Sequence, residues 1–491
     1  MKARPNILHI FTDQQRFDTI AALGNPLIHT PNLDALVREG TTFTRAYSPS
    51  PECVPARASM ITGWYPGRTG CFSNAEDMPP EDTPTLMSGL RDLGYRTHGI
   101  GKCHFKSDFY ALRGFQTRDI QEEGAEKREK DDYLSWLQKN GYGWVLEPHG
   151  IRGEMYYIPQ PSALPPEVHP THWVADRAVD FLKNHEAETQ PFYLYAGIIH
   201  PHPPFAPPIP WHKIYRAPDM PLPRGLNTDT EDLPFINRFQ NRYKYRDRGR
   251  DLNLIRCLRA YYYASITFLD AQVGRIMESL KKSGKWDDTL ILFSSDHGEY
   301  LGDFNCFGKR GFHDVSSRIP MIVKWPQGKM ADTRCDTPTS LVDLAPTFLA
   351  AAGHQAASDE YDGIDLHDLA TRKKQREFVF SQFKKADEGL YMAVNKDRKY
   401  AYSAPDNAEY FFDLEKDPHE MENLASDSSR KNELTTLRQT CADWVSKNDS
   451  HEAVADGGWR EYPKKKLPDN PDEGLIFQDP AWWDGTLPIE R

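Results

Sequence analysis

Short apolar runs alternate with segments of helical spacing along most of the chain. Residues 6–12, NILHIFT, form a β-branched and apolar run typical of a buried strand. Further runs of this kind occupy residues 95–99, 192–199 and 290–293, and apolar positions at helical spacing occupy residues 31–39, 83–93 and 254–281. Strands that alternate with helices predict an α/β fold, with a large doubly wound mixed sheet sandwiched by helices.

The pattern changes in the last quarter of the chain. Short alternating runs at residues 377–380 and 390–394, followed by helical spacing at about 430–446, predict a smaller C-terminal antiparallel sheet with a helix. We therefore expect a catalytic domain over residues 1–370 and a small α+β subdomain over residues 371–456.

Two other segments lack a regular pattern. The stretch 203–250 is rich in proline, aspartate and arginine, and we expect an extended insertion over the substrate side there. Residues 457–491 are dense in proline, aspartate and tryptophan. We expect them to form a tail packed on the body or on a neighbouring subunit, with Trp482 and Trp483 at the interface of a possible homo-oligomer.

Composition narrows the class of protein. The 491 residues include 60 Lys and Arg against 71 Asp and Glu, and this net charge of -11 argues against a nucleic-acid-binding surface. Charged residues make up 27% of the chain and no apolar run is long enough to span a membrane, so no membrane association is expected. Seven cysteines at irregular spacings fit a reducing compartment. The first residues lack a signal-peptide core, so we expect a cytoplasmic protein, or a periplasmic one if a signal peptide has been removed.

Acidic and polar residues follow two of the predicted strands. Asp13 and Gln14 come after the first strand, and Asp296 and His297 come after the strand at 290–293. Open α/β sheets bind ligands at the carboxyl ends of their strands, so we expect both pairs to meet in one crevice. Oxygen ligands favour Ca²⁺ or Mg²⁺, and the imidazole adds Mn²⁺ as an alternative. Taken alone, Asp13 could instead cap the N-terminus of a helix.

A cysteine, a proline and an arginine stand at fixed offsets in the run CVPAR at residues 53–57. The run follows a loop-like SPSP segment and leads into the helix-like ARASMITGW. This pattern indicates that Cys53 is a processed nucleophile, and the alternative is an ordinary buried thiol, which is where free cysteines usually lie.

Seven motifs occur in the order in which one enzyme family carries them: PNILHIFTDQ, CVPAR, GKCH, HPHPPF, SSDHGEYLGD, GKRGFHDVSSRIPMIV and YFFDLEKDPHEMENLA. Through them, nearly the whole chain resembles the sulfatase family of the alkaline-phosphatase-like superfamily. The resemblance implies that a formylglycine-generating or sulfatase-maturing enzyme converts Cys53 to formylglycine, which Arg57 steadies. It also implies a bound divalent metal, Ca²⁺ before Mn²⁺ or Mg²⁺, held beside residue 53 by Asp13, Gln14, Asp296 and His297.

The same resemblance assigns the groups that handle the sulfate. Lys102 and His104 match residues that hold the formylglycine hydroxyl and the sulfate oxygens, and Lys309 matches a sulfate-binding lysine. His202 matches the histidine that contacts the scissile ester oxygen, with His200 of the same HPH run as the alternative. The displacement needs a nucleophile, a cation for the equatorial oxygens and a proton for the leaving alkoxide, which His202, Lys309 or both would donate.

Two further functions stay open. Phosphonate monoester hydrolases share the Asp-Gln and Asp-His sites and the PHPPF run, but they are similar to one another in carrying tyrosine and threonine where this chain has Lys102 and His104. That difference favours a sulfatase that hydrolyses an O-sulfate ester over a phosphonate monoester or phosphodiester hydrolase. The third function is that of a catalytically silent protein that binds anionic glycans.

Substrate contacts are expected from the inserted segments, with these candidates: Asn74, His172, Arg310, Tyr243, Arg246 and Arg248. Arginines together with histidines suit a carboxylated and sulfated sugar through bidentate pairing, so the expected substrate is a small sulfated saccharide. The alternative for any one of these residues is solvated surface charge. His172 stands at the start of an amphipathic segment, where a capping or packing role is the alternative.

Overall fold

The computed structural model describes residues 4–124, 128–152, 155–245, 251–448 and 452–469. Within these ranges the largest sheet has eight strands in the order β5-β4-β6-β1-β7-β8-β2-β9. The strands are β1 (Asn6–Asp13), β2 (Thr41–Phe43), β4 (Arg96–Gly101), β5 (Thr117–Ile120), β6 (Phe192–Pro201), β7 (Thr289–Ser295), β8 (Met321–Lys324) and β9 (Thr333–Cys335). Strand β8 runs antiparallel to its neighbours β7 and β2, so the sheet is mixed, as predicted.

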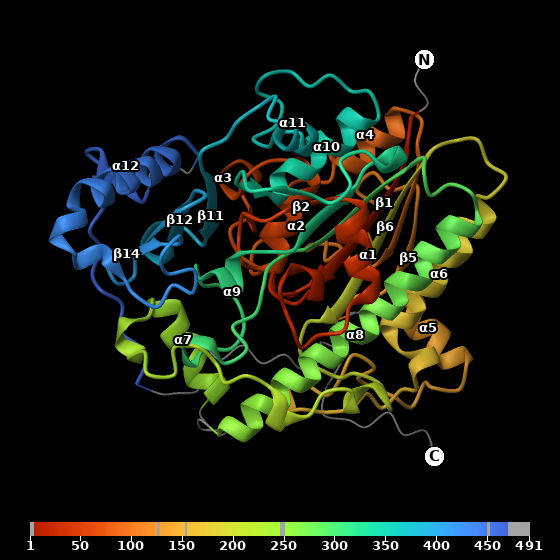
Figure 1. The fold of residues 1–491 in the computed structure, drawn as a ribbon, viewed down its shortest axis with the longest axis horizontal. Helices are drawn as coiled ribbons and strands as arrows, with labels where there is room; N and C mark the ends of the chain where they lie inside the picture. Colours follow the sequence, from red (N-terminus) through yellow and green to blue (C-terminus); the bar gives the residue numbers. More distant parts are fainter. Residues whose placement is uncertain (1–3, 125–127, 153–154, 246–250, 449–451, 470–491) are drawn as a thin grey trace.

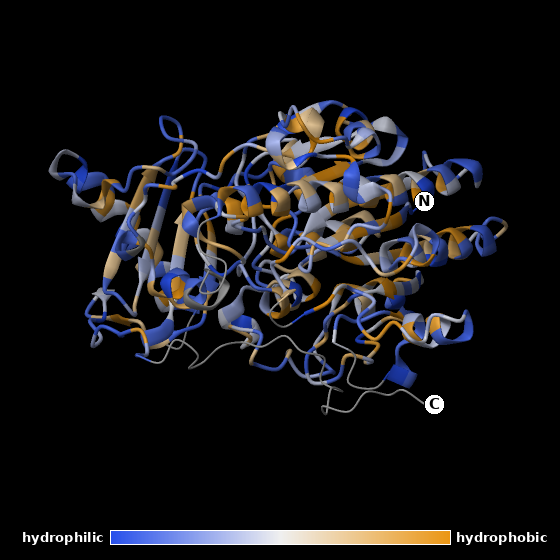
Figure 2. Ribbon diagram, turned by 90° about the horizontal axis from the view of Figure 1, so that it is seen from below, coloured by the Kyte–Doolittle hydropathy of each residue, from blue (hydrophilic) through white to orange (hydrophobic). Residues whose placement is uncertain are grey.

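Helices cover both faces of this sheet (Figure 1). One face packs against α1 (Pro31–Glu39), α5 (Asp132–Lys139), α6 (Pro170–Asn184) and α8 (Leu252–Lys282), and the other against α2 (Cys53–Thr62), α4 (Leu86–Asp92), α10 (Leu344–Ala351) and α11 (Leu366–Ala370). Side chains along β1 alternate between these two faces, as they do in any strand. Leu8 and Ile10 pack against the helices of the first group, and Ile7 and Phe11 pack against those of the second group. Figure 2 shows hydrophobic residues concentrated along the central strands. The predicted helix-covered mixed sheet is confirmed.

Three elements differ in detail from the prediction. Helix α4 starts at Leu86 rather than at residue 83, because the side chain of Thr85 accepts a hydrogen bond from Ser88 N at 3.1 Å and caps the helix there. Helix α2 begins at Cys53 itself, and Pro55 is tolerated because first-turn N–H groups have no partner within a helix. The stretch 203–250 is not wholly extended, since α7 (Phe235–Tyr245) lies within it.

Four antiparallel strands form the smaller C-terminal sheet that the alternating runs predict: β11 (Val379–Phe383), β12 (Leu390–Val394), β13 (Arg398–Ser403) and β14 (Ala408–Asp413). Helix α12 (Lys431–Asn448) packs on one face of it, and Tyr47 and Phe312 pack on the other. Figure 1 shows this unit beside the large sheet. The remaining short elements are β3 (Ala46–Tyr47), α3 (Pro66–Thr69), α9 (Asp314–Ser317), β10 (Thr339–Ser340), β15 (Val454–Ala455) and β16 (Gly458–Trp459).

The part of the C-terminal tail that the structure describes, up to residue 469, runs along this small sheet. The carbonyl of Tyr462 accepts from the side chain of Asn407 at 2.6 Å, and its N–H donates back at 3.1 Å. Trp482 and Trp483 lie outside the described residues. Among the residues described, no helix has both the length and the apolar character that crossing a membrane requires.

A buried lysine joins the small sheet to the large domain. Lys399 on β13 is fully buried, forms ion pairs with Asp314 and Glu420, and donates to the carbonyl of Phe312 at 3.0 Å. Burial raises the pKa of Glu420 to about 7, against the effect of the neighbouring lysine. Both carboxylates therefore share this ammonium group, and Asp314 also pairs with Arg318 at 3.0 Å.

We expect Lys399→Met to lower the free energy of unfolding by about 3–5 kcal/mol, because it leaves Glu420 buried without a cationic partner and leaves Asp314 with Arg318 alone. Urea-induced unfolding measures the change. Lys396→Met is the matched control, since Lys396 pairs with Asp336 at the exposed surface at 2.6 Å and its loss should leave stability essentially unchanged. Equal losses in the two variants would contradict the prediction.

Candidate active site

Four neighbouring parallel strands end at one edge of the large sheet. Strands β4, β6, β1 and β7 are adjacent and parallel, so their carboxyl ends lie side by side. Asp13 is the last residue of β1, and Lys102, His202 and Asp296 directly follow β4, β6 and β7. The crevice expected at the carboxyl edge thus brings together acidic, basic and imidazole side chains.

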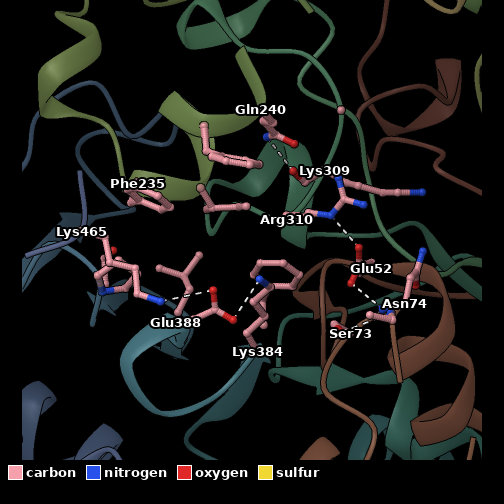
Figure 3. Close-up of a pocket in the computed structure, with 18 of the residues that line it drawn as sticks. Glu52, Ser73, Asn74, Phe235, Gln240, Lys309, Arg310, Lys384, Glu388 and Lys465 are labelled. Carbon is pink, nitrogen blue, oxygen red and sulfur yellow. Dashed lines mark hydrogen bonds and ion pairs between the residues drawn. The ribbon is translucent and has the colours of Figure 1, made fainter. Parts of the chain in front are cut away.

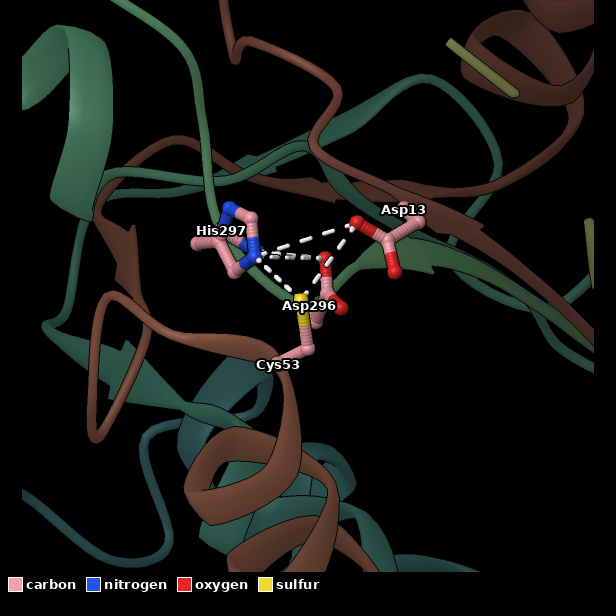
Figure 4. A group of neighbouring side chains, drawn as sticks. All are labelled: Asp13, Cys53, Asp296 and His297. Carbon is pink, nitrogen blue, oxygen red and sulfur yellow. Dashed lines mark hydrogen bonds and ion pairs between the residues drawn. The ribbon is translucent and has the colours of Figure 1, made fainter. Parts of the chain in front are cut away.

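Asp13, Cys53, Asp296 and His297 form a buried cluster whose ligand atoms all lie within 4.8 Å of one another (Figure 4). His297 Nε2 lies 3.8 Å from Asp13 Oδ1 and 3.6 Å from Asp296 Oδ1. The other ring nitrogen, Nδ1, faces the carbonyl of Gly298 at 3.0 Å and therefore carries the proton, which leaves the Nε2 lone pair free for the cluster. Two carboxylates and an imidazole lone pair around one point fit a divalent cation.

Gln14 connects this cluster to Lys309. Its backbone has the left-handed conformation, with a φ of 66°, and its N–H donates to Asp296 Oδ1 at 3.0 Å. The side-chain oxygen accepts from Lys309 Nζ at 3.0 Å, and the side-chain amide donates to Glu299. The amide oxygen that a metal would use is therefore shared with Lys309.

Cys53 is the first residue of α2, and only 1% of its surface is exposed. Its Sγ lies 3.3 Å from His297 Nε2 and accepts a hydrogen bond from Lys309 Nζ at 2.8 Å. Burial, reinforced by the charge of Asp13, raises the pKa of the thiol to about 12. The thiol is therefore protonated at neutral pH, and a protonated thiol is a weak nucleophile.

Cationic side chains compensate the two carboxylates. Arg57, on the first turns of α2, places Nη2 3.1 Å from Asp13 Oδ2 and 3.0 Å from Asp296 Oδ2. Lys102 Nζ lies 2.7 Å from Asp13 Oδ2 and also pairs with Glu123. Although burial opposes the charged form, Lys102 and the cations around it hold the pKa of Asp13 well below its usual value. Asp13 is thus ionised at neutral pH.

Lys309 and His202 lie beside the thiol, and His104 lies on the loop after β4. Lys309 Nζ contacts His202 Nε2 at 3.1 Å as well as Sγ of Cys53. His104 follows β4 in the left-handed conformation, and its buried Nδ1 has no hydrogen-bond partner among the described residues. Burial, reinforced by Lys102, holds the pKa of His104 well below its usual value. A neutral imidazole with an unused nitrogen fits a group that contacts a ligand.

A cavity of about 540 Å³ opens beside Lys309 (Figure 3). Asn74 and Arg310 line it, together with Glu52, whose carboxylate accepts from Arg310 Nε at 2.5 Å. Across the cavity lie residues of α7, of the small sheet and of the tail: Phe235, Ile236, Phe239, Phe383, Lys384, Leu390, Lys465 and Lys466. A cavity of this size accommodates a ligand much larger than a sulfate group.

Several of the predicted site residues do not line this cavity or lie outside the residues that the structure describes. His172 is on α6, 3.4 Å from Asp176, and does not line the cavity. His200 makes a hydrogen bond of 3.1 Å with Thr171, and its ring packs against that of His169. Arg246, Arg248 and the side chain of Tyr243 lie outside the described residues.

Two glutamates at the site were not predicted from the sequence, Glu299, which is buried, and Glu123, which is largely buried. Glu123 belongs to a charged stretch that reads as a surface loop, yet its carboxylate contacts Lys102 and His202. Glu299 accepts from Tyr157 at 3.1 Å and orients Gln14. Glu299 could have been found in the sequence, because it follows His297 by two residues in the motif SSDHGEYLGD. Nothing in the sequence around Glu123 indicates a place in the site.

The mixed sheet and the strand-end cluster beside a buried cysteine define a hydrolase of the alkaline-phosphatase-like superfamily. A profile described as sulfatase matches residues 5–354, and one described as N-sulphoglucosamine sulphohydrolase, C-terminal, matches residues 302–447. The chain belongs to the sulfatase family and is a sulfuric ester hydrolase.

Known relatives cover almost the whole chain. An arylsulfatase of Clostridium perfringens is 30% identical over an alignment of 467 positions, which covers 89% of this chain and 93% of the relative. A multifunctional alkaline phosphatase superfamily protein of Trinickia caryophylli is 31% identical over an alignment of 498 positions, which covers 90% of this chain and 95% of the relative. A phosphonate monoester hydrolase from Silicibacter pomeroyi has the same fold, with a TM-score of 0.79 at 24% identity over 94% of this chain and 100% of that one.

We expect Ca²⁺ at about 100 times its dissociation constant to stabilise the protein by about 2.7 kcal/mol, through binding to the folded cluster alone. Thermal unfolding with and without Ca²⁺ measures this, and Asp296→Asn should abolish the shift. Asp365→Asn is the matched control, because Asp365 belongs to a second, more exposed acidic group with His367 and Asp368. A shift that survives Asp296→Asn and is lost with Asp365→Asn would place the cation elsewhere.

Proposed function

We propose that the protein hydrolyses an O-sulfate ester through a formylglycine formed from Cys53 and a divalent metal. The observation that carries the proposal is the position of residue 53, where Lys309 Nζ lies 2.8 Å from Sγ and a metal-ligand cluster adjoins it. A sulfate ester needs these three groups together: a nucleophile, a metal ion and a further cation for its oxygens.

Asp13, Asp296 and His297 would hold the metal, with Gln14 as the fourth protein ligand. The metal supplies positive charge for the nucleophile and the sulfate oxygens. Oxygen ligands favour Ca²⁺, and the imidazole leaves Mn²⁺ and Mg²⁺ as alternatives. Arg57 keeps the two carboxylates in place, since one guanidinium nitrogen lies within 3.1 Å of both.

Formylglycine, as its hydrate, would supply one hydroxyl to attack sulfur and a second to release sulfate. The buried thiol is protonated and thus weakly nucleophilic, so conversion by a formylglycine-generating or sulfatase-maturing enzyme supplies the missing reactivity. Lys102, His104 and Lys309 would bind the sulfate oxygens around this position. The pair formed by Lys309 and His202 would then give a proton to the leaving alcohol.

The alcohol part of the substrate would occupy the cavity beside Lys309. Asn74 and Arg310 line the part of the wall that includes Lys309, and the guanidinium of Arg310 suits an anionic or hydroxyl-rich group. A small sulfated saccharide is the substrate class we propose, supported by the matching C-terminal profile of N-sulphoglucosamine sulphohydrolase. His172 is not included, because it faces Asp176 on α6.

We expect Cys53→Ala to reduce turnover of 4-nitrophenyl sulfate by several orders of magnitude, because no other group takes the place of the nucleophile. Intact-mass measurement of the wild-type chain should show a mass lower than that of the cysteine form. Cys71→Ala is the matched control, since Cys71 is a buried thiol outside the cluster. A wild-type chain with an unmodified mass and no turnover, whose binding of an anionic glycan Cys53→Ala leaves unchanged, would favour the silent anionic-glycan binder.

The phosphonate monoester or phosphodiester hydrolase is the second candidate, and relative rates separate it from the sulfatase. We expect kcat/KM to be higher for 4-nitrophenyl sulfate than for 4-nitrophenyl phenylphosphonate. Lys102→Ala should lower kcat/KM for the sulfate by roughly 10²–10³, as expected for loss of one electrostatic contact to the transition state. A preference for the phosphonate that Lys102→Ala leaves unaltered would reverse the assignment.

A further inference from the structure

Glu123 lies where three positively charged or protonatable side chains converge behind the cluster. Its Oε2 pairs with Lys102, and its Oε1 lies 2.7 Å from Arg152 Nη1 and 3.1 Å from His202 Nδ1. The carboxylate is 11% exposed. Although burial opposes its charge, His202, Lys102 and Arg152 hold the pKa of Glu123 well below its usual value. A largely buried carboxylate anion thus contacts the imidazole of His202.

The contacts of His202 decide which nitrogen carries its proton. Nδ1 faces two pure acceptors, Glu123 Oε1 at 3.1 Å and the carbonyl of Pro203 at 2.8 Å, so Nδ1 must be the donor. Nε2 faces Lys309 Nζ at 3.1 Å, and an ammonium group can only donate. The lone pair of Nε2 therefore points at Lys309.

The neighbouring glutamate has a different task. Glu122 accepts from the backbone N–H of Cys103 at 2.9 Å and of His104 at 3.1 Å, and it pairs with Arg118 at 3.1 Å. These contacts shape the loop after β4 and do not reach His202. Two adjacent buried carboxylates thus serve separate purposes.

We propose that Glu123 is a positioning residue that holds His202 in the Nδ1–H tautomer and thereby orients the His202–Lys309 pair for proton donation to the leaving alcohol. This inference rests on the proposed function. As the hydroxyl oxygen of the nucleophile at residue 53 bonds to sulfur, the bond from sulfur to the ester oxygen would break, and the ester oxygen would keep the bonding electron pair and take one proton from the His202–Lys309 pair. The water consumed by the complete hydrolysis returns that proton to the pair.

The carboxylate also contacts Lys102, which would bind sulfate oxygens. Lys102 lies 2.7 Å from Asp13 Oδ2 as well, so Asp13 holds this lysine in place when the charge at residue 123 is removed. A carboxylate hydrogen-bonded to imidazole Nδ1 orients the ring and stabilises its protonated form, as it does in other acid–base dyads. The imidazole of His202 would be protonated only during the transfer of a proton between His202, Lys309 and the leaving alcohol.

The experiment compares two sulfate esters that differ in their need for protonation of the leaving group. In the metal-loaded, matured enzyme, we expect Glu123→Gln to lower kcat/KM for phenyl sulfate by roughly 10²-fold and for 4-nitrophenyl sulfate by less than about threefold. His202→Ala should give the same selectivity. The double variant Glu123→Gln/His202→Ala should lose little more than His202→Ala alone, because the two residues act in one pathway.

Glu122→Gln is the matched control, and it should affect both esters by the same factor because its contacts are with backbone amides and Arg118. Equal losses on both esters in Glu123→Gln, or full additivity with His202→Ala, would overturn the inference while leaving the sulfatase assignment intact. Wild-type enzyme that cleaves neither ester would instead contradict the proposed function. If Glu123→Gln fails to fold, Glu123→Asp replaces it. The shorter side chain keeps the charge but moves it away from Nδ1 of His202, so kcat/KM should again fall more for phenyl sulfate than for 4-nitrophenyl sulfate.

Discussion

The site depends on the placement of two carboxylates in the interior of the protein, at the ends of adjacent parallel strands. Asp13 and Asp296 are fully buried, and an isolated buried carboxylate is costly unless cations and hydrogen bonds compensate it. Arg57 bridges them, Lys102 pairs with Asp13, and the backbone of Gln14 donates to Asp296. The positions of α2 and of the loop after β4 follow from this requirement, because each delivers one compensating group.

Residues of the small sheet and of α7 line one side of the cavity next to the charged carboxyl edge of the large sheet. Strand β13 is tied to the large domain by Lys399, whose ammonium is shared between Asp314 and Glu420. This attachment fixes β11 and β12, which supply Phe383 and Leu390 to the cavity. The proposed catalytic groups thus belong to the large domain, whereas residues of both the large domain and the small sheet line the cavity.

The sequence was sufficient for the framework of the fold and for much of the site. The β-branched runs before Asp13 and Asp296 identify the central strands. Adjacent parallel strands place their carboxyl ends at the same edge of the sheet, and this does not depend on the conformation of the loops between them. Glu123 could not be predicted, because its contact with His202 depends on how the loop after β5 folds over the edge. His172 was placed correctly near the start of a helix, but only packing reveals that it faces Asp176. The role of each predicted site residue stays a prediction.

All ten residues of α2 are buried, from Cys53 at its start to Thr62 at its end. In the folded protein this helix offers no edge or loop that another enzyme could bind. Any maturation of Cys53 therefore has to precede the packing of α2, while the segment is still an extended polypeptide. The order of events during biosynthesis would then decide how much of the protein is active, since a chain that folds first keeps its thiol permanently out of reach.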